Sequence, residues 1–412
     1  MIKYLILFTN SFPFVSTGEY TFIEPELSVL CKSFTRIFLV PQSNIGNLAH
    51  LPPNVEVDES YAKMVYQDHK IFSIFYALRS SFFWEELISR PKLLIQFAAL
   101  KRLVFFLGYA ELTYRWFQSF VERHDLPYSE TFCYTYWFDW ASFALGRLKL
   151  EHPSLKVVSR AHGVDLYEER HPFSYIPCRE KSIALLDRLF LISKNGRDYL
   201  AGRYPSQAKK FEIFRLGVLD PGFLSKKSTD RVHRLVSCSH AVPVKRLPML
   251  LDSLEILASN HPECRFLWTH LGDGSDLAVL KKRRYDLPDN LSLQLPGYLP
   301  NEGVLLFYQN NPVDLFLNIS ASEGIPVSIM EAQSCGIPVL ATKVGGTPEI
   351  VDPENGFLVE RNVSTEELAG LIWIGLNDPN LDKKRQLSRL SWQKGYNAEV
   401  NYEAFSEKLY SL

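Results

Sequence analysis

The sequence has almost no net charge, no closely spaced cysteines and no hydrophobic run long enough to span a membrane. Its 45 Lys and Arg residues balance 46 Asp and Glu residues, which argues against a nucleic acid as partner, since surfaces that bind nucleic acids carry an excess of positive charge. The six cysteines are scattered, without a CxxC pair or a metal-ligand spacing. We therefore expect free thiols, a reducing compartment and a cytoplasmic location.

The N-terminal run MIKYLILF is not followed by the small-residue cleavage site of a signal peptide, and we expect it to be a first buried strand. The chain also lacks internal repeats and tracts rich in Ser and Gly or in Gln and Asn. With 46% hydrophobic residues, a chain of 412 residues can form two or three ordinary domains. We therefore expect a globular protein.

Short apolar runs alternate with longer stretches of helical periodicity along the whole chain. The first half contains KYLILF, RIFLVP, TFCYTYW, KVVSRAHG and RLFLISK, and the second half contains RLVSCSH, CRFLWTHLGDG, LSLQLPG, VDLFLNIS and IPVLAT. Such alternation predicts right-handed βαβ units and mostly parallel sheets. We expect an α/β protein with two Rossmann-like, doubly wound domains.

The domain boundary is predicted in Phe211–Leu235, where a strand-like run gives way to Gly, Pro and charged residues. We place the first domain at residues 1–217, the second at residues 218–390, and a C-terminal amphipathic helix at residues 391–412. Ligands of open α/β sheets bind outside the carboxyl ends of the strands. The loops that follow the strands should therefore line a cleft between the two domains.

Residues 63–123 differ from the rest of the chain because they combine many aromatic residues with basic ones. Helices of this composition either pack on the first sheet or lie on an anionic membrane surface, with Lys and Arg at the headgroups and aromatic rings in the interface. The sequence leaves both interpretations open.

The stretch Asn318–Val351, NISASEGIPVSIMEAQSCGIPVLATKVGGTPEIV, reads as one βαβ unit with two glutamates. Glu323 falls on the loop after the strand VDLFLNIS. A helix is predicted from Pro326, as its first residue, to Gly336 at its C-terminal cap. The unit therefore carries one glutamate above the sheet and a second within the helix.

The start of this helix predicts an anion site. Its free backbone N–H groups, from about Val327 and Ser328 to Met330, suit a phosphate or diphosphate. Glu331, about five residues from the helix start, can accept hydrogen bonds from both hydroxyls of a ribose. The simplest alternative is that Glu323 and Glu331 are solvated charges of a loop and a surface helix, since this spacing often arises by chance.

Several stretches together resemble one family, the retaining glycosyltransferases of family 4, which have the GT-B fold. They are SEGIPVSIMEAQSCGIPVLATKVGGTPEIV, SCSHAVPVKRLPMLLDSL, LGDGSDLAVL, RAHGVDLY and GEYTFIEPEL. The resemblance covers most of the chain and is strongest in the second half. It implies two Rossmann-like domains that face a central cleft, with the C-terminal helix crossing back to the first domain.

The resemblance also implies roles for the second half of the chain. Glu331 holds the ribose, and Glu323, together with Gly324, approaches the transferred sugar. The family's basic loop supplies an Arg and a Lys to the diphosphate; Lys245 stands at the Lys position, but His240 occupies the Arg position. Arg246 can replace the missing contact, because a guanidinium can donate hydrogen bonds to two phosphate oxygens at once. A solvated helix start is the alternative for Lys245 and Arg246.

Further residues receive roles by the same resemblance. His162 contacts the donor sugar and stabilises developing charge, with Asp165 and Arg160 as orienting or acceptor-contacting neighbours. Gly18 lets the backbone approach a diphosphate or the acceptor, or else forms a plain turn. Three consecutive residues near the nucleotide complete the predicted site: Gly272, Asp273 and Gly274.

The implied reaction is a retaining, metal-independent hexosyl transfer from a nucleotide-diphosphate sugar, without a cofactor, in which the leaving phosphate accepts the proton of the acceptor. The implied acceptor is a glycan, and the aromatic and basic helices suggest a lipid-linked one at the inner face of a bacterial membrane. The implied setting is capsule, exopolysaccharide or lipopolysaccharide synthesis. Two alternatives remain open: a GT-B isomerase or phosphorylase, and a non-catalytic GT-B protein that binds nucleotide sugars.

Overall fold

The computed structural model describes residues 4–15, 19–67 and 69–412. The chain divides into two compact units, of which the first runs up to Phe214 and includes Tyr402–Leu412, and the second is Arg215–Asn401. The division lies three residues before the boundary expected from the sequence. Each unit contains a parallel sheet with helices, so the predicted fold class of two doubly wound domains is confirmed.

The first unit is built on a seven-stranded sheet with the order β5-β3-β1-β6-β7-β8-β9, in which every pairing is parallel. Its strands are β1 (Tyr4–Thr9), β3 (Arg36–Pro41), β5 (Val55–Val57), β6 (Thr131–Thr135), β7 (Lys156–Ala161), β8 (Arg188–Leu191) and β9 (Phe211–Ile213). The central strands are nearly continuous apolar runs because helices cover both faces. The strand order reverses between β1 and β6, and ligands of such sheets bind where the order reverses.

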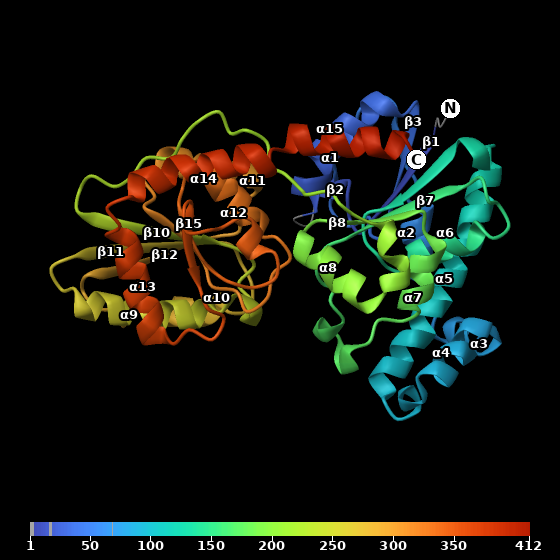
Figure 1. The fold of residues 1–412 in the computed structure, drawn as a ribbon, viewed down its shortest axis with the longest axis horizontal. Helices are drawn as coiled ribbons and strands as arrows, with labels where there is room; N and C mark the ends of the chain where they lie inside the picture. The colour runs from blue at the N-terminus through green and yellow to red at the C-terminus, as the bar shows by residue number, and fades with distance from the viewer. Residues whose placement is uncertain (1–3, 16–18, 68) are drawn as a thin grey trace. The chain divides into compact units, whose positions relative to one another are not determined.

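Eight α-helices of the first unit precede β9 among the described residues, and α3 and α4 lie apart from the sheet (Figure 1). They are α1 (Tyr20–Ser33), α2 (Ser60–Val65), α3 (Lys70–Arg79), α4 (Ser81–Ser89), α5 (Phe97–Arg123), α6 (Trp140–Leu148), α7 (Arg179–Leu185) and α8 (Lys194–Arg203). Two short strands, β2 (Phe14–Val15) and β4 (Asn47–Leu48), form a separate antiparallel sheet.

The aromatic segment of residues 63–123 packs in two ways. The second half of α5 buries Trp116, Phe117 and Phe120 against Phe8 and Phe38 of the sheet. The first half of α5 instead packs with α3, α4 and α6 in a separate apolar cluster (Figure 1). In the described parts of the chain, no helix combines the length and the apolar character needed to cross a bilayer.

The second unit is built on a six-stranded parallel sheet with the order β12-β11-β10-β13-β14-β15. Its strands are β10 (Val232–Cys238), β11 (Arg265–Leu271), β12 (Leu291–Gly297), β13 (Leu315–Asn318), β14 (Val339–Thr342) and β15 (Gly356–Val359). Its helices are α9 (Leu247–Asn260), α10 (Leu277–Arg283), α11 (Asn301–Asn310), α12 (Val327–Ser334), α13 (Thr365–Leu376) and α14 (Leu381–Gly395). Here the strand order reverses between β10 and β13.

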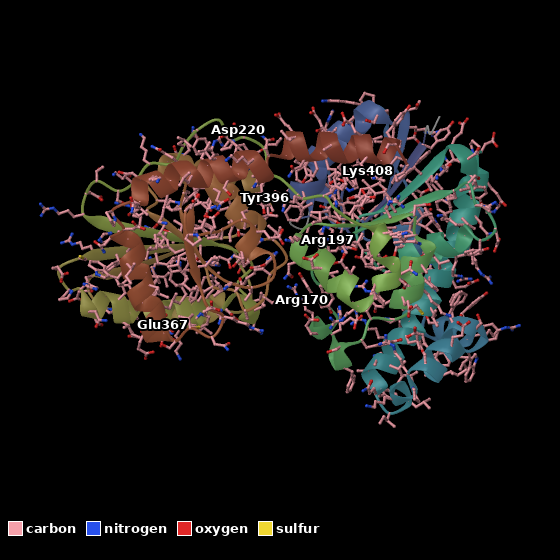
Figure 2. The ribbon with its side chains drawn as sticks, viewed as in Figure 1. Arg170, Arg197, Asp220, Glu367, Tyr396 and Lys408 are labelled. Carbon is pink, nitrogen blue, oxygen red and sulfur yellow. The ribbon has the colours of Figure 1, made fainter. Side chains whose placement is uncertain are left out.

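The predicted C-terminal helix that returns to the first domain is present, but it begins later than residue 391 because two helices lie in this region. Helix α14 ends at Gly395, and α15 (Ala398–Tyr410) begins after a short break. From Tyr402 onward the chain belongs to the first unit, where Phe405 and Leu409 are buried. Lys408 Nζ lies 2.8 Å from Glu212 Oε2 on β9 (Figure 2).

Candidate functional site

The loops after β10 and β13 leave the sheet of the second unit at the point where its strand order reverses. Lys245 ends a 3₁₀ turn in the first loop, and its Nζ lies 2.6 Å from Glu323 Oε1 in the second. The side chain of Asn318, the last residue of β13, lies 3.4 Å from the same oxygen. The Lys245 and Glu323 side chains are only 21% and 11% exposed. The structure therefore brings together two residues that lie 78 positions apart.

Arg246 does not point its guanidinium at an anion site in this structure. Its backbone adopts a left-handed conformation (φ 53°), and its side chain donates to the carbonyls of Ile319, Ser320 and Arg361 at 2.6, 3.2 and 2.8 Å. The guanidinium thus ties the first loop to the second. This placement does not support the diphosphate contact that the sequence suggested for Arg246.

The paired glycines of KVGGTPE hold the loop that carries Glu323. Gly345 has φ +53°, and a Cβ atom there would lie 1.9 Å from the Glu323 carbonyl oxygen. The Gly346 N–H donates to the Gly324 carbonyl at 2.7 Å. Only a residue without a side chain permits this close approach, so the glycines fix the backbone of Glu323.

The helix after this loop begins one residue later than predicted. Pro326 is its N-cap with extended backbone (φ −72°, ψ 120°), and α12 begins at Val327. The N–H groups of Ile329 and Met330 already donate to the Pro326 carbonyl. Within the described residues, the N–H groups of Val327 and Ser328 have no acceptor, so two free donors remain where the sequence suggested about four.

The C-terminal end of α12 also differs from the prediction. The helix ends at Ser334 with Cys335 as its cap residue, and Gly336 follows with φ +69°. Gly336 is therefore the residue after the cap, which is the left-handed position that favours glycine.

Glu331 is buried, with 7% of its surface exposed, so it is not the solvated helix charge of the simplest alternative. Its Oε1 accepts a hydrogen bond of 2.5 Å from Asn301 Nδ2, at the start of α11. Burial raises the pKa of Glu331 from 4.5 to about 7, and the Asn301 hydrogen bond opposes that rise. A buried carboxylate with one neutral partner is suited to accept hydrogen bonds from ligand hydroxyls.

The Cys238 thiol at the end of β10 lies within electrostatic range of Glu331 and Lys245. Burial raises its pKa, the Glu331 carboxylate raises it further, and the Lys245 ammonium opposes the rise. Lys245 and Glu331 are therefore both within electrostatic range of one buried atom, which places them at the same edge of the sheet.

Gly272 and Gly274 allow the loop after β11 to pack closely against the loop after β10. Their φ values are +147° and +149°, and a Cβ atom would lie 1.9 Å from the Ser239 carbonyl oxygen at the first and 2.5 Å from the Ala241 carbonyl oxygen at the second. The Asp273 carbonyl accepts from the Ala241 N–H at 2.9 Å. These residues thereby position the loop that carries Lys245.

Two side chains of this region face solvent. His240 and Asp273 are both exposed, and Asp273 Oδ1 accepts from the Gly274 N–H at 2.7 Å. Neither side chain lies in the buried part of the candidate site. Their roles toward a nucleotide stay predictions.

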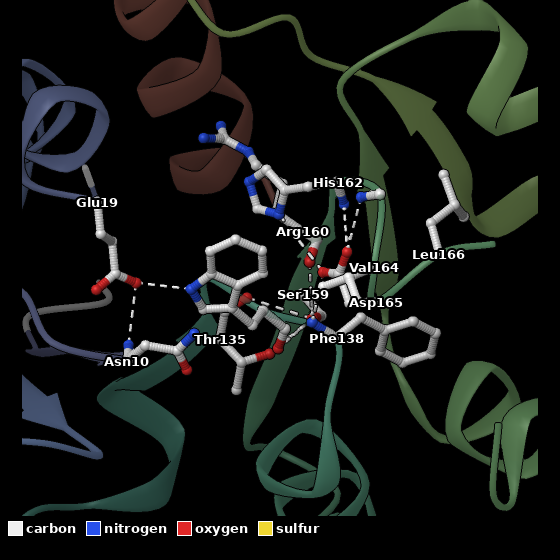
Figure 3. Close-up of polar contacts among 12 residues, drawn as sticks. Asn10, Glu19, Thr135, Phe138, Ser159, Arg160, His162, Val164, Asp165 and Leu166 are labelled. Atoms are coloured by element: carbon white, nitrogen blue, oxygen red, sulfur yellow. Dashed lines mark hydrogen bonds and ion pairs between the residues drawn. The ribbon is translucent and has the colours of Figure 1, made fainter. Parts of the chain in front are cut away.

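In the first unit, His162 follows β7 and is fixed by Asp165 (Figure 3). One Asp165 oxygen accepts from the N–H groups of His162 and Gly163 at 2.8 and 3.0 Å, and the other from the Phe138 N–H at 3.1 Å. His162 Nδ1 lies 3.4 Å from Asp165 Oδ2. Although burial acts to raise it, the pKa of Asp165 is lowered by these hydrogen bonds and by His162.

The His162 ring is held between two aromatic side chains. Its centroid lies 4.8 Å from Tyr136 and 4.5 Å from Trp137. Its Nε2 is buried and has no protein hydrogen-bond partner. A buried ring nitrogen without a partner is a candidate for contact with a bound molecule.

Sequence reasoning missed Glu19, which organises the loop after β1. Its carboxylate accepts from the N–H groups of Asn10, Ser11 and Phe12 at 3.0, 2.6 and 2.8 Å. It also accepts from Trp137 Nε1 at 2.6 Å. Figure 3 shows the hydrogen bond between Glu19 and Asn10. Glu19 therefore positions the ring that packs on His162. Glu19 lies within the stretch GEYTFIEPEL, but no local spacing predicts a partner 118 residues away.

The prediction that Arg160 contacts the acceptor is wrong. It is fully buried and forms an ion pair with Glu26, and its guanidinium lies 4.2 Å from the Phe405 ring centroid of α15. It therefore stabilises the core beneath the C-terminal helix. The predicted Gly18 lies outside the described residues.

The sequence of the second unit matches a known family. Residues 225–392 fit the family model described as glycosyl transferases group 1. The resemblance inferred from the sequence is thereby confirmed for this region, while the narrower assignment to retaining family 4 stays a prediction.

Individual relatives of this group 1 glycosyl transferase region are found among bacterial proteins. The chain is 27% identical over 217 residues to the putative colanic acid biosynthesis glycosyltransferase WcaL of Salmonella typhimurium, a match that covers 50% of this chain and 52% of WcaL. It is 25% identical over 213 residues to the amylovoran biosynthesis glycosyltransferase AmsK of Erwinia amylovora, with the same coverage. The chain spans about half the length of the curated relatives it matches.

One solved structure shares the fold over the whole length of the chain. HepE of Anabaena in complex with UDP aligns with a TM-score of 0.65 and 14% identity and covers 100% of both chains. At this level of identity the likeness shows the fold alone.

Proposed function

We propose that the protein transfers a hexosyl group from a nucleotide-diphosphate sugar to a glycan acceptor in bacterial surface polysaccharide synthesis. The observation that carries the proposal is the position of the Lys245–Glu323 pair and the buried Glu331–Asn301 pair at one edge of the group 1 sheet. The names of WcaL and AmsK, which refer to colanic acid and amylovoran, support the polysaccharide setting.

Each group has a distinct task in this proposal. Glu331 and Asn301 bind the ribose hydroxyls, and Lys245 with the free N–H groups at the start of α12 faces the diphosphate. Glu323 binds the transferred sugar. Uridine nucleotides are the first donors to test, because HepE was solved with UDP-glucose.

The proposed reaction is retaining. The bond between the anomeric carbon and the diphosphate oxygen breaks, and the acceptor oxygen forms a new bond on the same face of the sugar. The leaving phosphate accepts the hydroxyl proton. Lys245 stabilises the charge that develops on the diphosphate, and His162 Nε2 approaches the transferred sugar. Independence from metal ions and cofactors is part of the proposal, and turnover should persist in EDTA.

We expect the protein to transfer labelled hexose from a nucleotide sugar to a glycan acceptor present in a lipid extract. A thermal-shift screen of UDP-, GDP- and ADP-hexoses selects the donor, and transfer is then measured by chromatography and the product anomer by NMR. Donor binding without hydrolysis or transfer to any acceptor would instead support a non-catalytic protein. Conversion of the donor to another nucleotide sugar without an acceptor would support an isomerase.

We also propose peripheral contact with an anionic membrane through α3, α4 and the start of α5. Residues 71–97 expose large apolar side chains, namely Ile71, Ile74, Phe75, Leu78, Trp84, Ile88, Leu94, Ile95 and Phe97. Basic side chains lie among them, including Arg79, Arg90 and Lys92. Apolar side chains mixed with cations are suited to the headgroup region of an anionic bilayer.

Replacing Ile88 and Ile95 together by glutamate should weaken sedimentation with phosphatidylglycerol vesicles about tenfold or more, because each buries apolar area in the interface. Ile374→Glu on α13 of the second unit is the matched control, since Ile374 is also exposed. Equal vesicle binding by the double variant and the wild type would disprove the membrane contact.

A further inference from the structure

A cavity of about 710 Å³ lies within the first unit, at the carboxyl edge of its sheet. The loop after β1, the loop after β6 and the loop after β7 contribute Asn10, Trp137 and Asp165 to its wall. These loops meet where the strand order reverses. Helix α5 forms the opposite wall. The volume suits a ligand of one or two sugar units.

The α5 wall carries two cations. Lys101 is exposed and Arg102 is half-buried, and neither forms an ion pair with a carboxylate among the described residues. Burial lowers the pKa of Arg102. Burial also lowers the pKa of His171, which lines the same cavity, and the positive charge of Arg102 lowers it further. The α5 wall therefore carries two positive charges that are not held in ion pairs with described residues, which favours an anionic ligand.

Two carboxylates, Asp139 and Asp165, line the cavity away from the α5 wall. Asp165 accepts hydrogen bonds from backbone N–H groups and lies beside His162, as described above. Asp139 accepts from the Ala141 N–H at 2.8 Å and from Gln42 Nε2 at 2.6 Å. Burial raises the pKa of Asp139 to about 6, so part of its negative charge is lost toward slightly acidic pH.

Aromatic rings form the remaining wall. Tyr109 and Trp140 lie 5.3 Å apart with an interplanar angle of 32°, and Phe105 and Trp137 also line the cavity. Flat aromatic faces with polar edges suit the apolar face of a sugar ring. Trp137 in turn packs on His162. A sugar on these rings therefore lies beside the residue proposed to contact the transferred hexose.

The cations also lie next to the exposed apolar residues at the start of α5. Lys101 follows the exposed Phe97 by four residues, about 6 Å along the helix. Ile95 precedes it and is likewise exposed. A lipid chain attached to an anion at Lys101 and Arg102 can leave the cavity along this apolar surface.

We propose that the cavity binds the acceptor as a lipid phosphate, with the phosphate at Lys101 and Arg102, the sugar on Tyr109 and Trp140, and the lipid along Ile95 and Phe97. This inference rests on the proposed glycosyl transfer and specifies its acceptor class. It assigns substrate binding to residues of α5 that carry none of the donor contacts.

The test measures binding of the acceptor in the absence of a donor. A negative result would therefore reject this acceptor site without rejecting the proposed glycosyl transfer. Farnesyl diphosphate below its micellar concentration is the probe in calorimetry, with farnesol, inorganic diphosphate and phosphatidylglycerol vesicles as comparison arms. We expect micromolar binding of farnesyl diphosphate and weaker binding of both fragments. Lys101→Ala/Arg102→Gln should weaken it about tenfold or more, because charge-assisted hydrogen bonds to phosphate are lost.

The matched control is Lys281→Ala/Lys282→Gln on α10 of the second unit, which removes two exposed cations elsewhere. The single variant Lys101→Ala covers the case in which the double variant folds poorly. Equal binding by Lys101→Ala, the double variant and the wild type would overturn the proposal. So would inorganic diphosphate that binds as tightly as the lipid, UDP that displaces the lipid, or binding to vesicles alone.

Discussion

Replacing Glu331 by glutamine is expected to make the protein more stable at pH 8 and a poorer binder of its donor. In the folded protein the pKa of Glu331 is raised by burial to about 7, above its ordinary value of 4.5. The folded state therefore binds more protons than the unfolded state between these two values, and the free energy of unfolding falls as the pH rises through them. Above pH 7 the ionised carboxylate costs about 3 kcal/mol.

Glutamine does not ionise, and its carbonyl can still accept from Asn301. The Glu331→Gln variant should therefore lose the fall in stability between pH 4.5 and 7, while its affinity for the donor drops about tenfold or more because the ribose hydroxyls lose a charged acceptor. Urea unfolding at pH 5 and pH 8 and donor titration measure the two effects. Glu354→Gln, an exposed residue of the same unit, is the control. A variant less stable than the wild type at pH 8 would contradict the buried-charge explanation.

Replacing Lys245 by alanine is expected to raise the KM for the donor and to lower kcat about 100-fold to 1,000-fold. This ammonium is the cation proposed to stabilise the departing diphosphate, and removing one such group from a preorganised site has an effect of this order. The variant also leaves Glu323, which is only 11% exposed, with Asn318 as a distant neutral partner. We therefore expect a loss of about 1–3 kcal/mol in the free energy of unfolding.

Two variants separate these effects of Lys245. Lys245→Arg keeps the positive charge and should restore stability more than turnover. Lys343→Ala removes a lysine whose ion pair with Glu360 is exposed, and it should change neither quantity by much. If soluble, folded Lys245→Ala showed unchanged steady-state kinetics, the assignment of Lys245 to the diphosphate would be rejected.

Long apolar strands were predictable because their hydrophobic pattern is a local property of the sequence. Runs such as RIFLVP and KVVSRAHG are recognised without knowing their neighbours, and both are strands in the structure. A short strand such as Val55–Val57 carries too few residues for a pattern. The start of α12 was misplaced by one residue because Pro326 fits either a first helical residue or a cap with extended backbone.

The candidate site likewise contains residues that the sequence predicts and residues that it does not. Glu323 and Glu331 were predicted because they fall inside one recognisable βαβ unit, whereas Lys245 was assigned from the resemblance to the basic loop of family 4. Asn301 was missed because its hydrogen bond to Glu331 spans 30 residues. Arg246 was assigned by its chemistry alone, and the structure uses the same guanidinium to join two loops.

The sequence by itself determined the two parallel-sheet units, the glutamate pair and the basic loop, because strand periodicity, turn residues and charge are local properties. Only the tertiary structure decided that Lys245 meets Glu323, that Glu331 is buried with a raised pKa, and that Glu19 holds Trp137 beside His162. Burial and pairing depend on residues far apart in the chain. The crossover connections that bring strand ends to one edge create those contacts.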